Sequence, residues 1–447
     1  MSHLNYFEPY QSRPNHHEDQ LTRAFLVVLR YSPSAMMRFY SYCAGDTFMR
    51  AKQEHLDIEL PHLHQVLFHD IEMYTQRSSY EFNAAKILSV LITDQSLNLT
   101  PLQESIQISD RRAVYDGIIQ IGSDLTLLIE NKPNARNVWR DQLNPSLLNM
   151  SEENENVIIP VPAILEWRQI IQQLIDLLEM EAVSGMEKML IVDFLDFVDR
   201  RFMALNPYER FSKCKHDKIL LTRRIQNILE TKFSDNKPGY HKGWAYYVMA
   251  GTEGFPEIKQ IGVRLEHNDQ DKEDWKIEIS LYFGDIMKQA RSLYMRKDLN
   301  LEYLQFLRDK GWTTLTNPHI SMQSKNWYFF NSPENHNIET YIQYWQNNNS
   351  AELIQYSKAD LRDTMLKKWA DLGLIQINET VHLNFIDKLR NVQETTMFNW
   401  CPGFRILYFI PANKAIRLDD EGLFDNYLRE KFNEGLKVLG DAYGTKF

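Results

Sequence analysis

Three residues in one short stretch, Asp116, Glu130 and Lys132, are of types that suit phosphodiester chemistry. Carboxylate oxygens are the ligands that hard divalent cations prefer in proteins. An ammonium group can offset the negative charge that grows on phosphorus during hydrolysis. The three residues therefore indicate metal-dependent hydrolysis, provided that the fold brings their side chains together.

The residues around this trio predict the element that would bring them together. Residues 114–121 and 125–129 alternate in the manner of two strands, and the Gly122-Ser123-Asp124 loop between them has a common hairpin length. With Ser123 at the centre of the loop, the antiparallel register places Asp116 opposite Glu130. Because side chains alternate along a strand, Lys132 lies on the same face as Glu130.

A pair of opposed carboxylates is unfavourable unless something neutralises it. Two like charges directly across a hairpin repel each other. A divalent cation between Asp116 and Glu130 removes that repulsion, and open oxygen coordination favours Mg²⁺, with Mn²⁺ as a substitute. Such an ion can bind a phosphodiester oxygen and acidify a bound water. Lys132 can then orient the water or stabilise the developing charge.

The pattern of Asp116-Gly117, a hairpin and then Glu130-Asn131-Lys132 resembles the core of the PD-(D/E)XK nuclease superfamily. Tyr115 stands where the name of the motif has proline. The resemblance covers roughly residues 15–160, and it implies a restriction-endonuclease-like α/β core with a mixed sheet flanked by helices. It also implies that Asp116, Glu130 and the carbonyl of Asn131 hold the metal while Lys132 assists the nucleophile.

The resemblance implies two further catalytic residues. Members of the family carry an acidic residue on the helix before the sheet, and Glu18 occupies a similar position. Some branches place a glutamine after the lysine, and Gln142 is the match. Each has a plainer interpretation: Asn15 and Glu18 have the spacing of a helix capping box, and Gln142 is a polar residue on a surface helix.

Basic residues just after the motif suggest how a nucleic acid would be held. Arg136 and Arg140 lie four residues apart, on one face of a helix predicted over 136–143. They could bind the phosphates on either side of the scissile bond.

The hairpin context distinguishes this motif from chance copies. Glu257-Ile258-Lys259 and Asp274-Trp275-Lys276 have the same short pattern. The first copy has no aspartate in a preceding hairpin strand, and the acids of the second lie beside a turn. A structural alternative remains for the main motif, which is an exposed strand end with a salt bridge that contributes little to stability.

Composition excludes several classes of protein. The 447 residues carry a formal net charge of -10, which excludes a wholly basic surface but allows a local basic groove. Three widely spaced cysteines argue against a disulfide framework. The N-terminal stretch is polar and no apolar run is long enough to span a membrane, so we expect a soluble cytoplasmic protein.

The chain is long enough for two domains. We expect the nuclease core with its helical elements over 1–230 and an α+β domain over 244–447, separated by the polar stretch 231–243. The C-terminal domain would serve specificity, sensing or oligomerisation.

Periodicity predicts the remaining elements. The predicted helices are 18–30, most of 35–100, 163–182, 186–205, 285–310 and 351–372. The predicted strands are 157–160, 258–265, 276–282, 327–330 and 404–410.

These patterns favour a Mg²⁺-dependent endonuclease that hydrolyses DNA, and many members of the family defend bacteria against foreign DNA. The alternative is a nuclease-fold binding or sensor subunit whose cleavage is absent or requires a partner defence protein. A homodimer would suit cleavage of both strands of a duplex.

Overall fold

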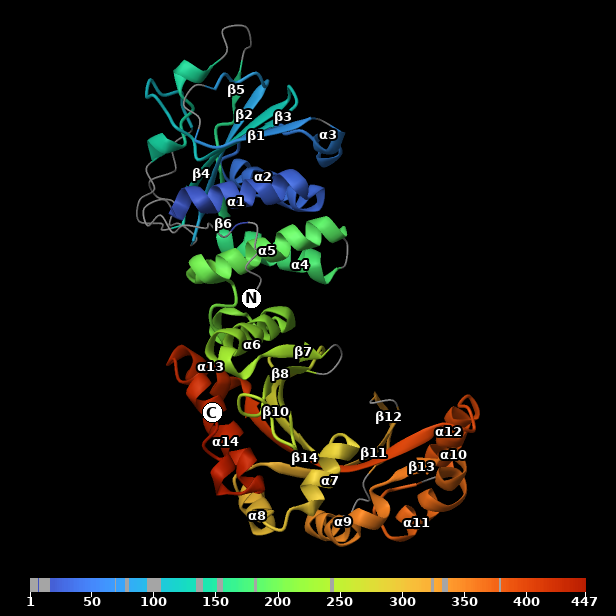
Figure 1. Ribbon diagram of the computed structural model, residues 1–447. Coiled ribbons are helices and arrows are strands. Elements are labelled where there is room, and N and C mark those ends of the chain that lie inside the picture. The colour runs from blue at the N-terminus through green and yellow to red at the C-terminus, as the bar shows by residue number, and fades with distance from the viewer. Residues whose placement is uncertain are drawn as a thin grey trace. The chain divides into compact units, whose positions relative to one another are not determined.

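The computed structural model divides the chain into two compact units, Met1–Glu209 and Arg210–Phe447 (Figure 1). Each unit has its own sheet and helices. The structure describes residues 7, 17–68, 70–76, 80–94, 106–133, 140–150, 156–180, 183–241, 245–322, 325–331, 337–377 and 379–447.

A mixed sheet forms the centre of the N-terminal unit. Its described strands are β1 (Ile71–Tyr74), β2 (Lys86–Thr93), β3 (Gly117–Ile121), β4 (Leu125–Lys132), β5 (Val157–Ile158) and β6 (Ala163–Glu166). They lie in the order β1-β3-β4-β2-β5, and β6 also pairs with β2. The β1–β3 and β3–β4 pairs are antiparallel, whereas β2 runs parallel to β4, β5 and β6. The expected mixed α/β class is confirmed for this unit.

The predicted hairpin is present with the predicted register. Gly117 pairs with Ile129 and Ile121 pairs with Leu125, so the next pair beyond Gly117 is Asp116 and Glu130. Gly122 in the loop has a positive φ of 52°, a backbone conformation that glycine adopts without steric strain. Turn length and alternation were therefore sufficient to define this element.

The prediction that 35–100 is mainly helical is wrong beyond residue 70. β2 lies in the middle of the sheet, and seven of its eight residues are buried. A strand covered on both faces has a continuous apolar run instead of an alternating one, and such a run resembles a buried helix in sequence. The stretch 163–182 likewise begins as strand β6 before its helix starts at Trp167.

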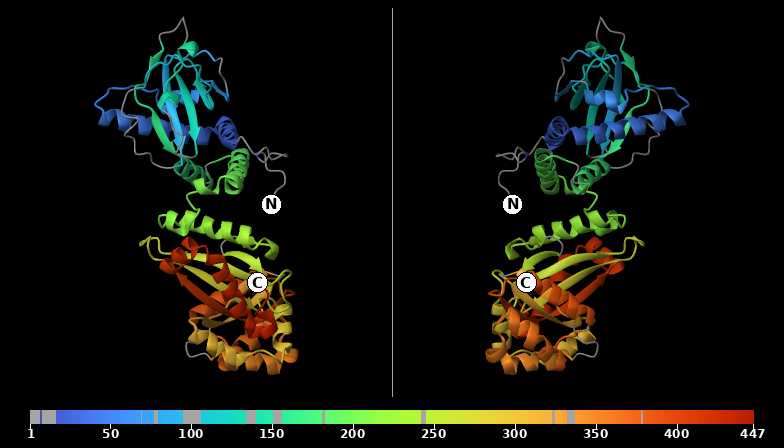
Figure 2. Two further views of the ribbon diagram at one scale, coloured as in Figure 1. Left: turned by 90° about the vertical axis from the view of Figure 1, so that its left-hand side faces the viewer. Right: turned by 90° about the vertical axis from the view of Figure 1, so that its right-hand side faces the viewer.

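Helices of this unit pack against the sheet or against one another (Figures 1 and 2). They are α1 (His17–Tyr31), α2 (Pro33–Gln53), α3 (Leu63–Phe68), α4 (Trp167–Glu179) and α5 (Gly185–Arg201). α1 contacts β1, β3 and β4, while α2 contacts β6. The predicted apolar stripe of α1 is fully buried at Leu21, Phe25, Val28 and Leu29.

The C-terminal unit is built on a separate antiparallel sheet. Its described strands are β7 (Gly239–His241), β8 (Ala245–Met249), β9 (Gln260–His267), β10 (Trp275–Phe283), β11 (Thr313–Met322), β12 (Lys325–Phe329), β13 (Gln355–Ser357) and β14 (Met397–Pro411). The order is β12-β11-β14-β10-β9-β8-β7, and β13 also pairs with β14. The predicted β9–β10 hairpin is confirmed.

Helices of this unit pack against the second sheet or against one another. They are α6 (Lys218–Lys232), α7 (Met287–Met295), α8 (Leu301–Asp309), α9 (Ile338–Glu352), α10 (Lys358–Asp360), α11 (Leu366–Asp371), α12 (Glu379–Arg390), α13 (Ala412–Asp420) and α14 (Phe424–Leu436). A π-helical turn, Leu361–Met365, joins α10 to α11. No helix among the described residues is long and apolar enough to cross a membrane.

The chain divides earlier than the expected linker at 231–243. Helix α6 belongs to the C-terminal unit, where it contacts β8 and β9. Arg224 on α6 forms an ion pair of 2.6 Å with Asp419 on α13. This pairing joins residues almost two hundred positions apart, so local composition could not reveal which unit would contain α6.

The end of β4 is attached to two helices by one fully buried side chain, Asn131. Its Nδ2 donates to Thr22 Oγ1 on α1 at 2.9 Å, and its Oδ1 accepts from Trp167 Nε1 on α4 at 2.8 Å. A buried amide that satisfies two buried partners fixes the position of the strand end. The residues on either side of Asn131 are held in place by the same contacts.

We predict that Asn131→Ala lowers the free energy of unfolding by about 2–4 kcal/mol, because it leaves two buried groups without a partner. Urea unfolding measures this loss. The matched comparison is Trp167→Phe, alone and combined with Asn131→Ala. In a double-mutant cycle, Trp167→Phe should lower the free energy of unfolding by less in the Asn131→Ala background than in the wild type. Strictly additive losses would argue against the network.

Candidate active site

The three motif residues converge at one end of the β3–β4 hairpin. Asp116 directly precedes β3, and Glu130 and Lys132 lie in the last three residues of β4. The register places Asp116 beside Glu130, at the end far from the turn. Two strands therefore contribute two carboxylates and one ammonium to a single location, as the sequence predicts.

Asp116 is held by two hydrogen bonds beyond the end of the β-ladder. Its Oδ2 accepts from the backbone N–H of Asn131 at 2.9 Å, and its Oδ1 accepts from Gln76 Nε2 at 3.2 Å. Gln76 Nε2 also donates to Asp19 Oδ1 on α1 at 2.9 Å. The carboxylate is thus oriented by the backbone of β4 and connected through one amide to a further acid.

Glu130 and Lys132 form an ion pair in which Nζ and Oε1 are 2.9 Å apart. Glu130 is only 7% exposed, and the side chain of Lys132 is 14% exposed. The alternative of an exposed surface salt bridge requires solvated partners. Because the side chains of Glu130 and Lys132 are largely shielded from solvent, their ion pair is not an exposed surface salt bridge.

The electrostatic environment raises the pKa of both acids. Burial raises the pKa of Asp116, and the charge of Asp19 adds to that rise, against the opposing effects of the Asn131 N–H and Lys132. Burial and then repulsion by Asp116 raise the pKa of Glu130 to about 7, although Lys132 and Arg111 counteract them. The site therefore contains more negative charge than its single lysine neutralises.

Such a donor set fits a hard divalent cation. Glu130 is buried and Asp116 is half-buried, and two such carboxylates with raised pKa values are stabilised when a cation replaces their protons. Asp116 and Glu130 supply oxygen ligands at one place, and the carbonyl of Asn131 remains a predicted third ligand. Among the described residues, no group of three or more histidine, cysteine, aspartate or glutamate side chains is placed to hold a metal. Any ion here would need backbone, water or substrate oxygens as well.

The other predicted site residues are described only in part. Glu18 lies in the first turn of α1, but its side chain is outside the described residues, as is Asn15. Gln142 is half-buried in the 3₁₀ helix Arg140–Gln142. The side chain of Arg140 and all of Arg136 lie outside the described residues. The roles proposed for these residues stay predictions.

Three residues near the site were not selected from the sequence. Asp19 and Gln76 are linked to Asp116, and Arg111 acts on the charge of Glu130. Asp19 lies three residues before Thr22, the partner of Asn131, so helical spacing placed it on the face that meets β4. No comparable signal existed for Gln76, which has an uncommon positive φ of 51° just after β1.

The two chance copies of the motif have other structural roles. Glu257 is buried and forms an ion pair of 3.2 Å with Arg296. Lys276 forms an ion pair of 3.1 Å with Glu266, its direct neighbour across the β9–β10 hairpin. Two carboxylates also meet near Lys276, because Glu266 lies beside Glu278, but Arg264 pairs with both acids, at 2.9 and 2.7 Å, and neutralises them.

Comparison of the chain with models of protein families, with curated proteins and with solved structures returns no significant match.

We predict that the metal-free protein loses stability as the pH rises from 5 to 8. The folded pKa of Glu130, about 7, lies above its ordinary value, so its stabilising proton is fully bound at low pH and is lost as the pH passes through 7. The loss should be on the order of 2–3 kcal/mol, measured by urea unfolding in EDTA.

Glu130→Gln should reduce this pH dependence, because glutamine does not titrate. The matched control is Glu59→Gln, since Glu59 is an exposed acid whose pKa is lowered by Lys86. That control should keep the pH dependence of the wild type. If the wild type and Glu130→Gln lost the same free energy of unfolding between pH 5 and pH 8, the assigned environment of Glu130 would be contradicted.

Proposed function

We propose that the N-terminal unit is a restriction-endonuclease-like phosphodiesterase that hydrolyses DNA with Mg²⁺ or Mn²⁺. The observation that carries this proposal is the convergence of Asp116 and Glu130, both with raised pKa values, beside the ammonium of Lys132. Asp116 is half-buried and Glu130 is buried, so two acids beside one base leave uncompensated charge that is destabilising unless a ligand neutralises it.

Each residue has a distinct part in this proposal. Asp116 and Glu130 would hold the cation together with the carbonyl of Asn131, and the bound ion would supply Lewis acidity toward a phosphodiester oxygen and a water. The Asn131 N–H and Gln76 orient the carboxylate of Asp116. Lys132 holds an ammonium 2.9 Å from Glu130, where it can offset charge on a phosphate.

DNA as the substrate, a cytoplasmic location and a part in bacterial defence extend the proposal through the resemblance to the PD-(D/E)XK nucleases. Arg136 and Arg140 are proposed to hold flanking phosphates, Glu18 to act from α1, and Gln142 to act after the lysine. A homodimer is proposed for the cleavage of both strands.

One observation favours a second candidate function, a nuclease whose activity needs a trigger. Asp116 already accepts two hydrogen bonds, and Glu130 is already paired with Lys132. A site whose groups satisfy one another resists a cation until something separates them. A sensor subunit whose cleavage requires a partner protein fits this closed arrangement.

We predict that Asp116→Asn, Glu130→Gln and Lys132→Ala each lower the rate of plasmid cleavage in Mg²⁺ by at least about a hundredfold. The rate is measured as conversion of supercoiled plasmid to nicked and linear forms. A labelled RNA of equal length, run in parallel, identifies the preferred nucleic acid.

The matched controls are Glu59→Gln and Lys86→Gln. These residues form a lysine–carboxylate ion pair of 3.0 Å beside the same sheet. Lys86 pairs with Leu125 at the far end of β4, about 23 Å from Lys132 along the strand. Both control variants should cleave as the wild type does. Equal cleavage by the wild type and by all three site variants would refute the assignment.

The triggered alternative has its own expected result. Purified wild-type protein would then be inactive alone, whereas cell extract from the producing organism would restore cleavage to the wild type and not to Glu130→Gln. Inactivity of the wild type in both conditions would favour a nuclease-fold binding protein without turnover.

A further inference from the structure

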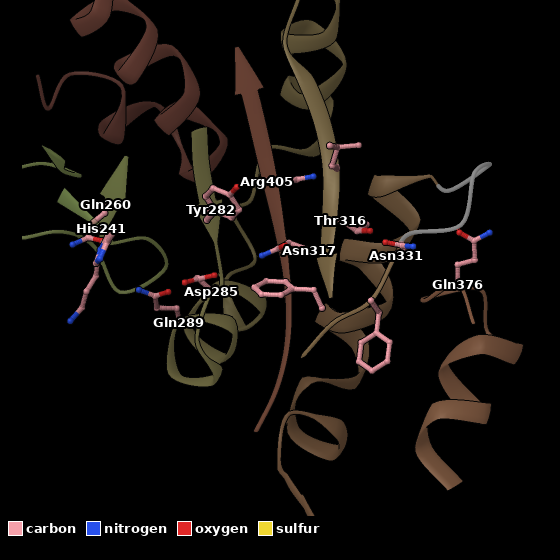
Figure 3. Close-up of a pocket in the computed structure, with 14 residues that line it drawn as sticks. His241, Gln260, Tyr282, Asp285, Gln289, Thr316, Asn317, Asn331, Gln376 and Arg405 are labelled. Atoms are coloured by element: carbon pink, nitrogen blue, oxygen red, sulfur yellow. Dashed lines mark hydrogen bonds between the residues drawn. The ribbon is translucent and has the colours of Figure 1, made fainter. Parts of the chain in front are cut away.

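A pocket of about 900 Å³ lies in the C-terminal unit, on the sheet formed by β7 to β14 (Figure 3). Its wall includes residues of β9, β10, β11, β12 and β14 and the first turn of α7. This volume is within the range of small-molecule sites.

The register of the sheet explains the composition of the floor. Arg405 on β14 lies between Tyr282 on β10 and Leu315 on β11, its direct neighbours across the strands. The adjacent residues Leu281 and Ile406 face the other side, where they lie close to Gly435 of α14. Helix α14 therefore covers the apolar face, and the opposite face presents an arginine and a tyrosine to the pocket (Figure 3).

Two donors in this floor have no partner among the described residues. Arg405 Nη1 donates to Tyr282 Oη at 3.4 Å, but its Nε has no acceptor. Asn317, on β11 two residues beyond Leu315, is only 8% exposed, and its Nδ2 has no acceptor either. Unpaired buried donors are unfavourable, so two of them in one pocket point to an acceptor supplied by a ligand.

The charges in the pocket favour an anion. Lys259 is exposed at the wall and, like Arg405, forms no ion pair with the described residues. Among the described residues of the wall, Asp285 is the one acid, and its Oδ1 lies 3.9 Å from the buried ring of His319. Two cations thus face the cavity against one acid, and an arginine matches the geometry of a phosphate or carboxylate group.

The far end of the pocket has an exposed aromatic face. Phe329 on β12 is 54% exposed and stacks on His319, with the ring centres 4.9 Å apart and the planes at 28°. A ring fixed on one side by stacking and open on the other can bind a planar group. Amide side chains of Gln289 and Asn331 lie in the same wall and can bond the edge of a heterocycle.

The two ends lie at a defined separation along β11. Arg405 is opposite Leu315, and Phe329 is opposite His319, four residues further on. Arg405 on β14 and Phe329 on β12 are also two strands apart, because β11 lies between them. At about 3.3 Å per residue and about 4.8 Å per strand, the backbone positions of Arg405 and Phe329 are about 16 Å apart. A ligand that reaches both must combine an anionic group, a spacer and a planar ring.

We propose that this pocket binds a nucleoside monophosphate unit, with its phosphate on Arg405 and Lys259 and its base on Phe329. Asn317 contributes a hydrogen bond between the two ends. The unit could belong to a free nucleotide or to the end of a DNA strand, since both present the same chemistry. The inference concerns the C-terminal unit alone and does not depend on nuclease activity.

The test is isothermal titration calorimetry of the purified full-length protein in EDTA, which prevents metal-dependent cleavage. The probes are the four nucleoside 5′-monophosphates, the dinucleotide pApA and a 5′-phosphorylated DNA tetranucleotide, with adenosine and ribose 5-phosphate as half-ligands. At least one nucleotide probe should bind about tenfold more tightly than either half-ligand, because only a complete nucleotide reaches both ends. Binding of the mononucleotides identifies a free nucleotide, and binding of the tetranucleotide alone identifies a strand end.

Variants assign any binding to the pocket. Arg405→Gln should weaken it by about tenfold or more, and Lys259→Gln by about threefold. Lys259 is exposed, so its variant remains informative if Arg405→Gln fails to fold. The matched control is Lys276→Gln on β10, where the lysine pairs with Glu266 outside the pocket wall and binding should stay unchanged. Absence of binding by every nucleotide probe up to about 1 mM, or equal binding by the wild type and Lys259→Gln, would overturn the proposal.

Discussion

The repulsion between two carboxylates at the end of a buried hairpin is the constraint on which the N-terminal unit depends. Asp116 and Glu130 are adjacent in the register, burial raises the pKa of each, and Lys132 offsets only part of their charge. The backbone N–H of Asn131 donates a hydrogen bond to Asp116, and its side chain forms hydrogen bonds with α1 and α4. The fold therefore holds an unfavourable arrangement rigidly in place. Such an arrangement is expected where a site is prepared for a cation and a phosphate.

The parts of this site that could be predicted are those that local sequence determines. The three-residue loop and the alternation of apolar residues define the β3–β4 register, and the register places Asp116, Glu130 and Lys132 together. The apolar stripe of α1 follows from helical periodicity in the same way. Each of these features depends on residues close in the chain, so its physical cause is visible in a short window of sequence.

The parts that could not be predicted depend on contacts between distant segments. β2 is covered on both faces, and its continuous apolar run has no period that separates a strand from a helix. The membership of α6 in the C-terminal unit involves a long-range contact, the ion pair between Arg224 and Asp419. Gln76 reaches Asp116 from the residues after β1, through a backbone conformation that composition does not signal. The pocket of the C-terminal unit is likewise lined by strands that are far apart in sequence, so no short window of sequence predicts which residues line it.

Direct measurement of cation binding at the paired carboxylates tests the central claim most closely. Electron paramagnetic resonance of Mn²⁺, titrated into the purified chain at pH 8, reports binding whether or not a substrate is known. We predict one tightly held Mn²⁺ ion per chain and an affinity at least about tenfold weaker in Asp116→Asn. Unchanged Mn²⁺ binding in that variant, or no bound ion in the wild type, would contradict the account.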